Sequence, residues 1–140
     1  MTRHLLVPMD DSERARAALE HAVSLFPDDE VTVLHVVDDL EAGYGGGRPP
    51  VTTGGEKRVD DEDPDFFEDV RSIAAAHDRT VETTVIEGTS ADAILEYARE
   101  HDVDQIVMGS QGRSGVSRML LGSIAEAVTR QSSVPVTIVP

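Results

Sequence analysis

The 140-residue chain contains no cysteine and no tryptophan, and aromatic residues make up only 4% of it. Without cysteine the chain can form neither disulfides nor thiolate metal sites, and thiol catalysis is excluded. Val, Ile, Leu and Ala are left to build the core, a composition that suits a parallel sheet covered by helices. No apolar run approaches the roughly 18 residues of a membrane span, so we expect a cytoplasmic protein with no membrane partner.

Basic residues are also scarce, and Lys57 is the only lysine. Against 27 acidic residues the chain has 12 Lys and Arg, which gives a formal net charge of −15. Nucleic acid is therefore excluded as a partner, because phosphate backbones require a basic face. The acids are spread along the whole chain, which indicates adaptation to a salt-rich cytoplasm, as in a halophilic archaeon, rather than an acidic tail. At about 1 M salt the screening length falls to roughly 3 Å, and this much like charge becomes tolerable.

One stretch of this acidic chain contains no acid at all. From Gln105 to Ala125 there is neither Asp nor Glu, and the only charged residues are Arg113 and Arg118. The stretch is rich in glycine and serine and lies between a strand-like run and a helix-like run. A glycine-rich, acid-free segment in a protein that otherwise repels anions predicts a phosphate-binding loop.

The apolar pattern alternates between strands and helices along the chain, which predicts a single-domain α/β sandwich of three layers around a parallel sheet. Strands are expected at 5–9, 31–37, 81–86, 105–108 and 134–139, and helices at 13–26, 65–77, 90–101 and 123–130. Residues 38–64 are rich in Gly, Pro and acids, and we expect a long surface loop there. Its basic residues Arg48, Lys57 and Arg58 leave open a role as a lid over phosphate, beside the simpler interpretation of an unstructured connection.

In a sheet of this kind, ligands bind beyond the C-terminal ends of the strands, where the strand order reverses. Asp10, Val36 and Gly109 each lie at the expected end of a strand. We therefore expect these residues to converge on one site although they are far apart in sequence.

The spacing Gly-x2-Gly-x9-Gly-Ser, from Gly109 to Ser123, resembles the nucleotide-binding signature of the ATP-binding branch of the universal stress protein family. The resemblance covers the whole chain, 1–140. It includes the opening Leu5–Ser12, the strand Leu34–Val37, the turn Glu87-Gly88 and the closing Ser133–Val136. It implies an adenine nucleotide alpha hydrolase-like sheet of order 3-2-1-4-5, a homodimer, and ATP held with Mg or Mn.

The physical basis of such a motif is that glycines let backbone N–H groups approach phosphate oxygens and can adopt positive φ, while a helix N-terminus adds free N–H groups. The resemblance implies that the triphosphate is contacted by Gly112, Arg113, Gly122, Ser123 and Ile124. It further implies that the ribose and base are held by Pro8, Met9, Asp10, Val36, Met108 and Gly109.

Simpler interpretations exist for several of these residues. Ser123 with Glu126 also matches a helix capping box, and Asp10 with Ser12 could simply cap the first helix. Judged singly, Pro8, Val36 and Met108 fit a hydrophobic core.

Enzymatic activity has little support in the sequence. The Walker motif and the dinucleotide fingerprint are absent, and the five histidines show no metal spacing. The preferred interpretation is a homodimeric ATP-binding module without efficient turnover, paired through an exposed strand at 134–139. Two alternatives remain: a slow ATPase that uses Asp10 or Asp11 near a metal, and a scaffold that binds no nucleotide.

Overall fold

The computed structural model describes residues 2–38, 64–110 and 121–140. Five parallel strands form one sheet in the order β3-β2-β1-β4-β5, which confirms the expected fold class and strand order. The strands are β1 (His4–Pro8), β2 (Glu30–Asp38), β3 (Glu82–Gly88), β4 (Gln105–Gly109) and β5 (Val136–Val139). The helices are α1 (Glu13–Leu25), α3 (Phe67–Ala76), α4 (Ser90–Glu100) and α5 (Ser123–Gln131).

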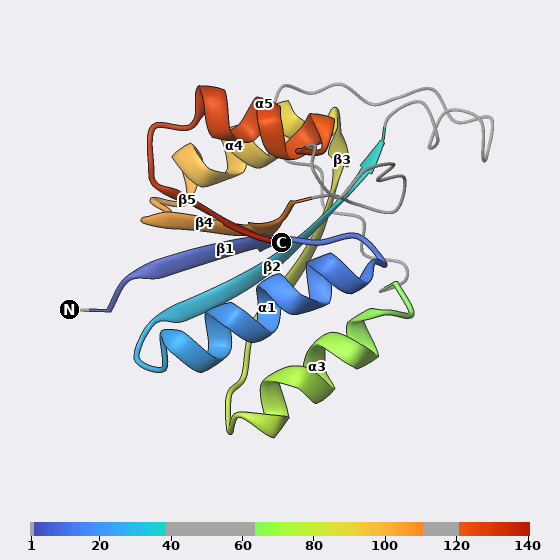
Figure 1. Cartoon of the computed structure of the whole chain (residues 1–140), viewed down its shortest axis with the longest axis vertical. Helices are drawn as coiled ribbons and strands as arrows, with labels where there is room; N and C mark the ends of the chain where they lie inside the picture. The colour runs from blue at the N-terminus through green and yellow to red at the C-terminus, as the bar shows by residue number, and fades with distance from the viewer. Residues whose placement is uncertain (1, 39–63, 111–120) are drawn as a thin grey trace.

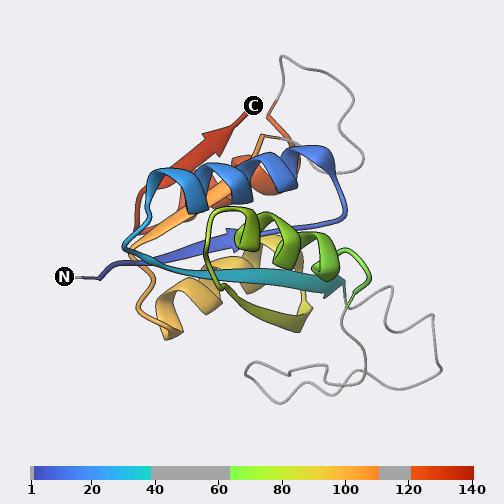
Figure 2. The same ribbon diagram turned by 90° about the horizontal axis from the view of Figure 1, so that it is seen from below.

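The helices cover both faces of the sheet, as Figures 1 and 2 show. Helices α1 and α3 pack on one face, where Leu5, Val7 and Met9 of the β1 segment join the buried cluster. Helices α4 and α5 pack on the other face, where Leu6, Ile106 and Met108 are buried. The strands alternate between these two clusters because successive side chains point to opposite faces.

Helix α1 forms where the sequence predicts it. The hydroxyl of Ser12 accepts a hydrogen bond from the N–H of Ala15 at 3.2 Å and caps the first turn. The buried face consists of Ala15, Ala18, Leu19, Ala22 and Val23. The three alanines among them let α1 lie close to the sheet.

Helices α3 and α4 end in the same way. Asp78 and Asp102 adopt positive φ values of 55° and 52° directly after the two helix ends. The N–H groups of Arg79 and Val103 then bond back to the carbonyls of Ala74 and Ala98 at 2.8 and 3.0 Å. Both ends are Schellman motifs in which aspartate occupies the position that usually holds glycine.

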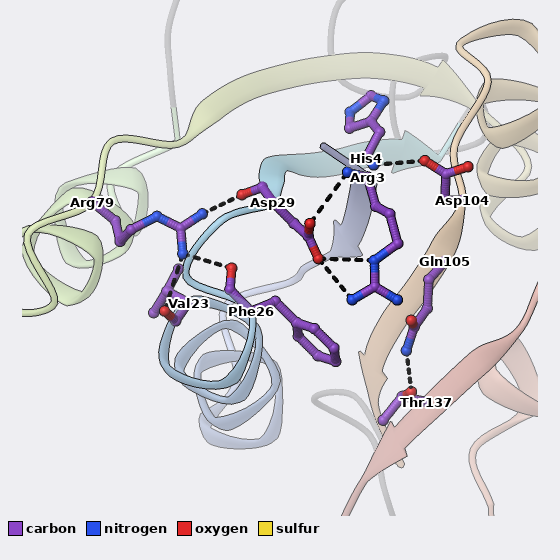
Figure 3. Close-up of polar contacts among 9 residues, drawn as sticks. All are labelled: Arg3, His4, Val23, Phe26, Asp29, Arg79, Asp104, Gln105 and Thr137. Atoms are coloured by element: carbon purple, nitrogen blue, oxygen red, sulfur yellow. Dashed lines mark hydrogen bonds and ion pairs between the residues drawn. The ribbon is translucent and has the colours of Figure 1, made fainter. Parts of the chain in front are cut away.

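A polar cluster closes the N-terminal end of the sheet (Figure 3). The side chain of Arg3 contacts the buried carboxylate of Asp29 at 2.9 Å. Arg79 donates hydrogen bonds to the carbonyls of Val23, Phe26 and Asp29, where α1 ends and β2 approaches. Burial alone would raise the pKa of Asp29, but the N–H groups of Arg3, with Arg79 nearby, hold that pKa below its usual value.

Strand β5 begins at Val136, so the expected start at Val134 was wrong. The N–H of Val134 bonds to the hydroxyl of Ser132 at 3.1 Å instead of joining the ladder. Pro135 has no N–H, and its carbonyl makes the first contact to β4, with Ile106 at 2.9 Å.

The expected loop at 38–64 falls almost entirely on residues 39–63, which lie outside the described part of the chain. Within the described ranges, no helix is long and apolar enough to cross a membrane.

Candidate functional site

The predicted site residues on the first, second and fourth strands come together at the C-terminal edge of the sheet. Strand β1 lies between β2 and β4, and Pro8 pairs with Leu34 of β2. The ladder continues past β1, since the N–H of Met9 bonds to the carbonyl of Leu34 at 2.8 Å. The edge thus gathers these predicted residues: Pro8, Met9, Asp10, Val36, Met108 and Gly109.

Three of these side chains share one face. Met108 is 6% exposed and belongs to the cluster beneath α4 and α5, and Val36 packs against the same cluster. Pro8 is buried and, two residues after Leu6, points to this face as well. The three residues expected to wall a base therefore lie on the side of the sheet where α5 begins.

Met9 points the opposite way. Its side chain is 5% exposed and is packed in the cluster under α1 and α3. Its carbonyl oxygen lies 2.9 Å from Nδ1 of His35. Because a carbonyl only accepts, His35 carries its proton on Nδ1 when neutral. The side chain of Met9 is thus part of the core.

His35 itself is a residue whose role at this edge the sequence did not reveal. We interpreted it, like the other histidines, as structural or surface. It is half-buried, and its ring meets the ring of Phe66 edge-on at a centroid distance of 5.1 Å. The available signal was strand alternation, which places His35 with Val33 and Val37 on the face of α1 and α3.

Gly109 ends β4 directly beneath the first turn of α1. A methyl group at this position would lie 2.9 Å from the carbonyl carbon and oxygen of Arg14. The φ angle of Gly109 lies outside the left-handed region, so backbone conformation does not require glycine here. Glycine is required because the backbone of α1 occupies the space of a side chain.

Gly122 closes the acid-free segment. Its N–H bonds to the carbonyl of Ser110 at 2.7 Å, and the N–H of Ser110 bonds to the carbonyl of Val139 at 2.9 Å. Gly122 is also the N-cap of α5, with φ −62° and ψ 154°, angles that any residue can adopt. Positive φ is therefore not required at Gly122 either.

Helix α5 starts at Ser123, so the alternative of a capping box with Ser123 as the cap was wrong. Gly122 holds the cap position, and no side chain caps this helix. The carboxylate of Glu126 contacts Arg130 at 2.8 Å instead of reaching back. Ser123 and Ile124 are exposed, with Ile124 at 42%. The first N–H groups of a helix have no acceptor within it, so this end can receive an anion.

Asp10, Asp11 and Ser12 follow the β1 segment and have different surroundings. Ser12 caps α1, while Asp11 forms an ion pair with Arg16, which also contacts Asp69 of α3 at 2.9 Å. The hydrogen bond that Arg16 donates to Asp11 raises the pKa of Arg16, burial lowers that pKa, and Asp69 raises it further. Asp10 is half-buried at the end of β1. The N-cap of α1 is Ser12, which confirms the Ser12 part of the capping alternative.

Two predicted phosphate ligands, Gly112 and Arg113, lie outside the described residues. Within residues 2–38, 64–110 and 121–140, no three His, Asp or Glu side chains are placed to hold a metal ion.

Comparison with known proteins identifies the family and agrees with the fold. The model of the universal stress protein family matches residues 1–140. The chain is 30% identical over 139 residues to universal stress protein MJ0531 of Methanocaldococcus jannaschii, covering 98% of this chain and 81% of that protein. The solved structure of MJ0577, from the same organism, superposes with a TM-score of 0.69 at 26% identity over 99% of this chain and 96% of that one. A universal stress protein from Archaeoglobus fulgidus in complex with dAMP superposes with a TM-score of 0.63 at 22% identity, over 100% of this chain and 98% of that one.

Proposed function

This chain belongs to the universal stress protein family, and on that premise we propose that it binds ATP as a homodimeric, nucleotide-dependent stress-signalling module of the cytoplasm without efficient turnover. The observation that carries the proposal is the start of α5. An exposed helix N-terminus without a side-chain cap lies at the sheet edge where Gly122 is tied to Ser110. The N–H groups of Ser123 and Ile124 supply donors for phosphate oxygens there.

The apolar side of the edge suits a base. Pro8, Val36 and Met108 share the face on which α5 lies, and the backbone at the end of β2 offers donors and acceptors to the rim of adenine. Asp10, half-buried at the end of β1, is placed to accept hydrogen bonds from ribose hydroxyls. Gly112 and Arg113 complete the proposed triphosphate site.

The likeness to the A. fulgidus complex with dAMP supports the fold alone, because the identity is 22%. The residues of this chain therefore carry the choice of ligand. They fit a nucleotide whose phosphates meet the start of α5. A divalent ion, Mg or Mn, would be held chiefly by the phosphates, since the described side chains form no metal cluster. Asp10 and Asp11 are the nearest carboxylates in the chain to the end of β1.

The homodimer is proposed to form through β5. This strand is the last in the sheet order and, among the described residues, pairs only with β4. A second copy that pairs along the outer edge of β5 would satisfy its free backbone groups. Because Pro135 lacks an N–H, pairing would be confined to Val136–Val139.

The test is calorimetric titration of Mg-ATP into wild type and Gly122→Val in multimolar KCl. The angles of Gly122 permit valine, so the fold should persist while the side chain blocks the start of α5. We expect at least a tenfold loss of affinity. The control is Gln131→Val, which introduces the same side chain at the exposed far end of α5. Unchanged affinity in Gly122→Val would contradict the site.

Two further measurements separate the alternatives. Single-turnover hydrolysis of ATP by the purified protein would reveal a slow ATPase. Mass spectrometry of the co-purified ligand would show no nucleotide if the protein is a ligand-free scaffold. Sedimentation velocity measures the dimer, and a species of monomer mass at every protein concentration would contradict it.

A further inference from the structure

Arg14 lies at the closest contact between α1 and the proposed site. The backbone of Arg14 occupies the space above Gly109, and a methyl group on Gly109 would lie 3.0 Å from the Cβ of Arg14. Gly109 is followed at once by Ser110, whose carbonyl receives the N–H of Gly122. The side chain of Arg14 therefore starts beside Ser110, which is hydrogen-bonded to Gly122 within the acid-free segment.

The direction of α1 carries that side chain toward the sheet edge. Side chains on a helix lean toward its N-terminus, and α1 begins at the C-terminal end of β1. This lean directs the side chain of Arg14 toward the C-terminal edge of the sheet, where the proposed site lies. Arg14 is half-buried, so part of its side chain is already held by the protein.

The lack of any hydrogen-bond acceptor for its side chain among the described residues sets Arg14 apart from the other half-buried arginines. Arg16 is paired with two aspartates, and Arg79 donates to three carbonyls. Arg14 makes no hydrogen bond or ion pair with any of the residues that the structure describes. In a chain of net charge −15, a half-buried cation without an acceptor for its side chain is unusual. Among the described residues no carboxylate pairs with Arg14, which leaves its charge available to an anionic ligand.

We propose that Arg14 contacts a phosphate group of the bound nucleotide and sets the preference of the site for nucleoside polyphosphates over uncharged nucleosides. This inference rests on the proposed function, because it assigns one more ligand to the same site. A guanidinium contributes two parallel N–H donors and a permanent charge to a phosphate. The affinity for adenine nucleotides should then rise with the number of phosphates, and Arg14 should account for a large part of that rise.

The experiment compares adenosine, AMP, ADP and Mg-ATP as ligands for wild type, Arg14→Gln, Arg14→Lys and Arg99→Gln, each titrated at two salt concentrations. Arg99 is exposed in the last turn of α4, at the opposite end of the sheet, and controls for the loss of one positive charge. We expect Arg14→Gln to bind Mg-ATP about tenfold more weakly, and adenosine within about twofold of wild type. Arg14→Lys should retain much of the ATP affinity, and Arg99→Gln should match wild type. The salt dependence of ATP binding should weaken in Arg14→Gln only.

The outcomes distinguish failure of the role of Arg14 from failure of the proposed function. If wild type binds ATP but Arg14→Gln and Arg99→Gln lose the same factor, the role of Arg14 is refuted and the proposed function stands. Equal losses for adenosine and ATP in Arg14→Gln would show a purely structural role and also refute it. If wild type binds none of the four ligands, the proposed function falls, and the inference falls with it. Thermal unfolding of each variant confirms that all four proteins are folded.

Discussion

The Nδ1 atom of His35 lies 2.9 Å from the main-chain carbonyl oxygen of Met9. This hydrogen bond joins the end of β1 to β2 on the side of the sheet opposite the proposed base site. The edge-on contact of His35 with Phe66 adds the residue that precedes α3. One imidazole thus links three segments that must keep their relative positions for the edge of the sheet to be formed.

Replacing His35 by leucine should destabilise the protein by about 1–3 kcal/mol, because the carbonyl of Met9 loses its side-chain donor in a half-buried place. His35→Asn should restore much of the loss, since its amide nitrogen can take the position of Nδ1. Urea unfolding at fixed salt measures both variants. Equal losses in the two would show that packing against Phe66, rather than the hydrogen bond, explains the effect.

Gly109→Ala should cost about 1–3 kcal/mol, because the new methyl group must push away the backbone of Arg14 at 2.9 Å. A backbone cannot move aside as a flexible side chain can. Gly122→Ala is the matched control, since its φ of −62° suits alanine. Denaturant unfolding of the two variants should differ clearly, and a neutral Gly109→Ala would contradict the close contact.

Asp78→Gly and Asp102→Gly should each stabilise the protein by about 0.5–1 kcal/mol. Both positions have positive φ, which costs an aspartate more than a glycine, and each carboxylate lies at the negative end of a helix dipole. Asp28→Gly removes an equally exposed carboxylate without a positive φ and should bring no gain. Thermal unfolding in the same buffer ranks the three variants.

Asp29 should make stability depend on pH in the acid range. Its pKa is lower in the folded than in the unfolded chain, so its contribution is fully present above the unfolded value of about 3.9 and is lost as pH falls through the folded pKa. Asp29→Asn should lose about 2–3 kcal/mol at neutral pH and flatten the curve below pH 4. Unfolding free energies from pH 2 to 7 at constant ionic strength measure this. Parallel curves for wild type and variant would contradict the assignment.

Much of the fold could be predicted because apolar spacing reports burial directly. The positions of Ala15, Ala18, Leu19, Ala22 and Val23 indicate one helical face, and all five are buried in α1. The start of β5 was harder to predict. Val134 has the hydropathy of a strand residue, but its N–H is taken by the hydroxyl of Ser132, a local hydrogen bond that an apolar pattern does not reveal.

The candidate site was predictable only where strand ends determine it. Asp10, Val36 and Gly109 meet because the C-terminal ends of parallel strands share one edge. The reason for glycine at 109 was not predictable, because it depends on the depth at which α1 packs. The partner of His35 and the place of Arg14 follow from register and helix rotation, which a single sequence does not specify.

The hydrogen bond between Gly122 and Ser110 has a consequence for how this protein can change. This bond holds the two residues together across the sequence between them, and both belong to the described scaffold. The residues between them can then be exchanged for those of a relative while β4, β5 and α5 keep their places, since lengthening a segment whose ends are held together adds little entropic cost. Such an exchange is therefore a direct way to test whether this segment determines the proposed anion binding without rebuilding the core.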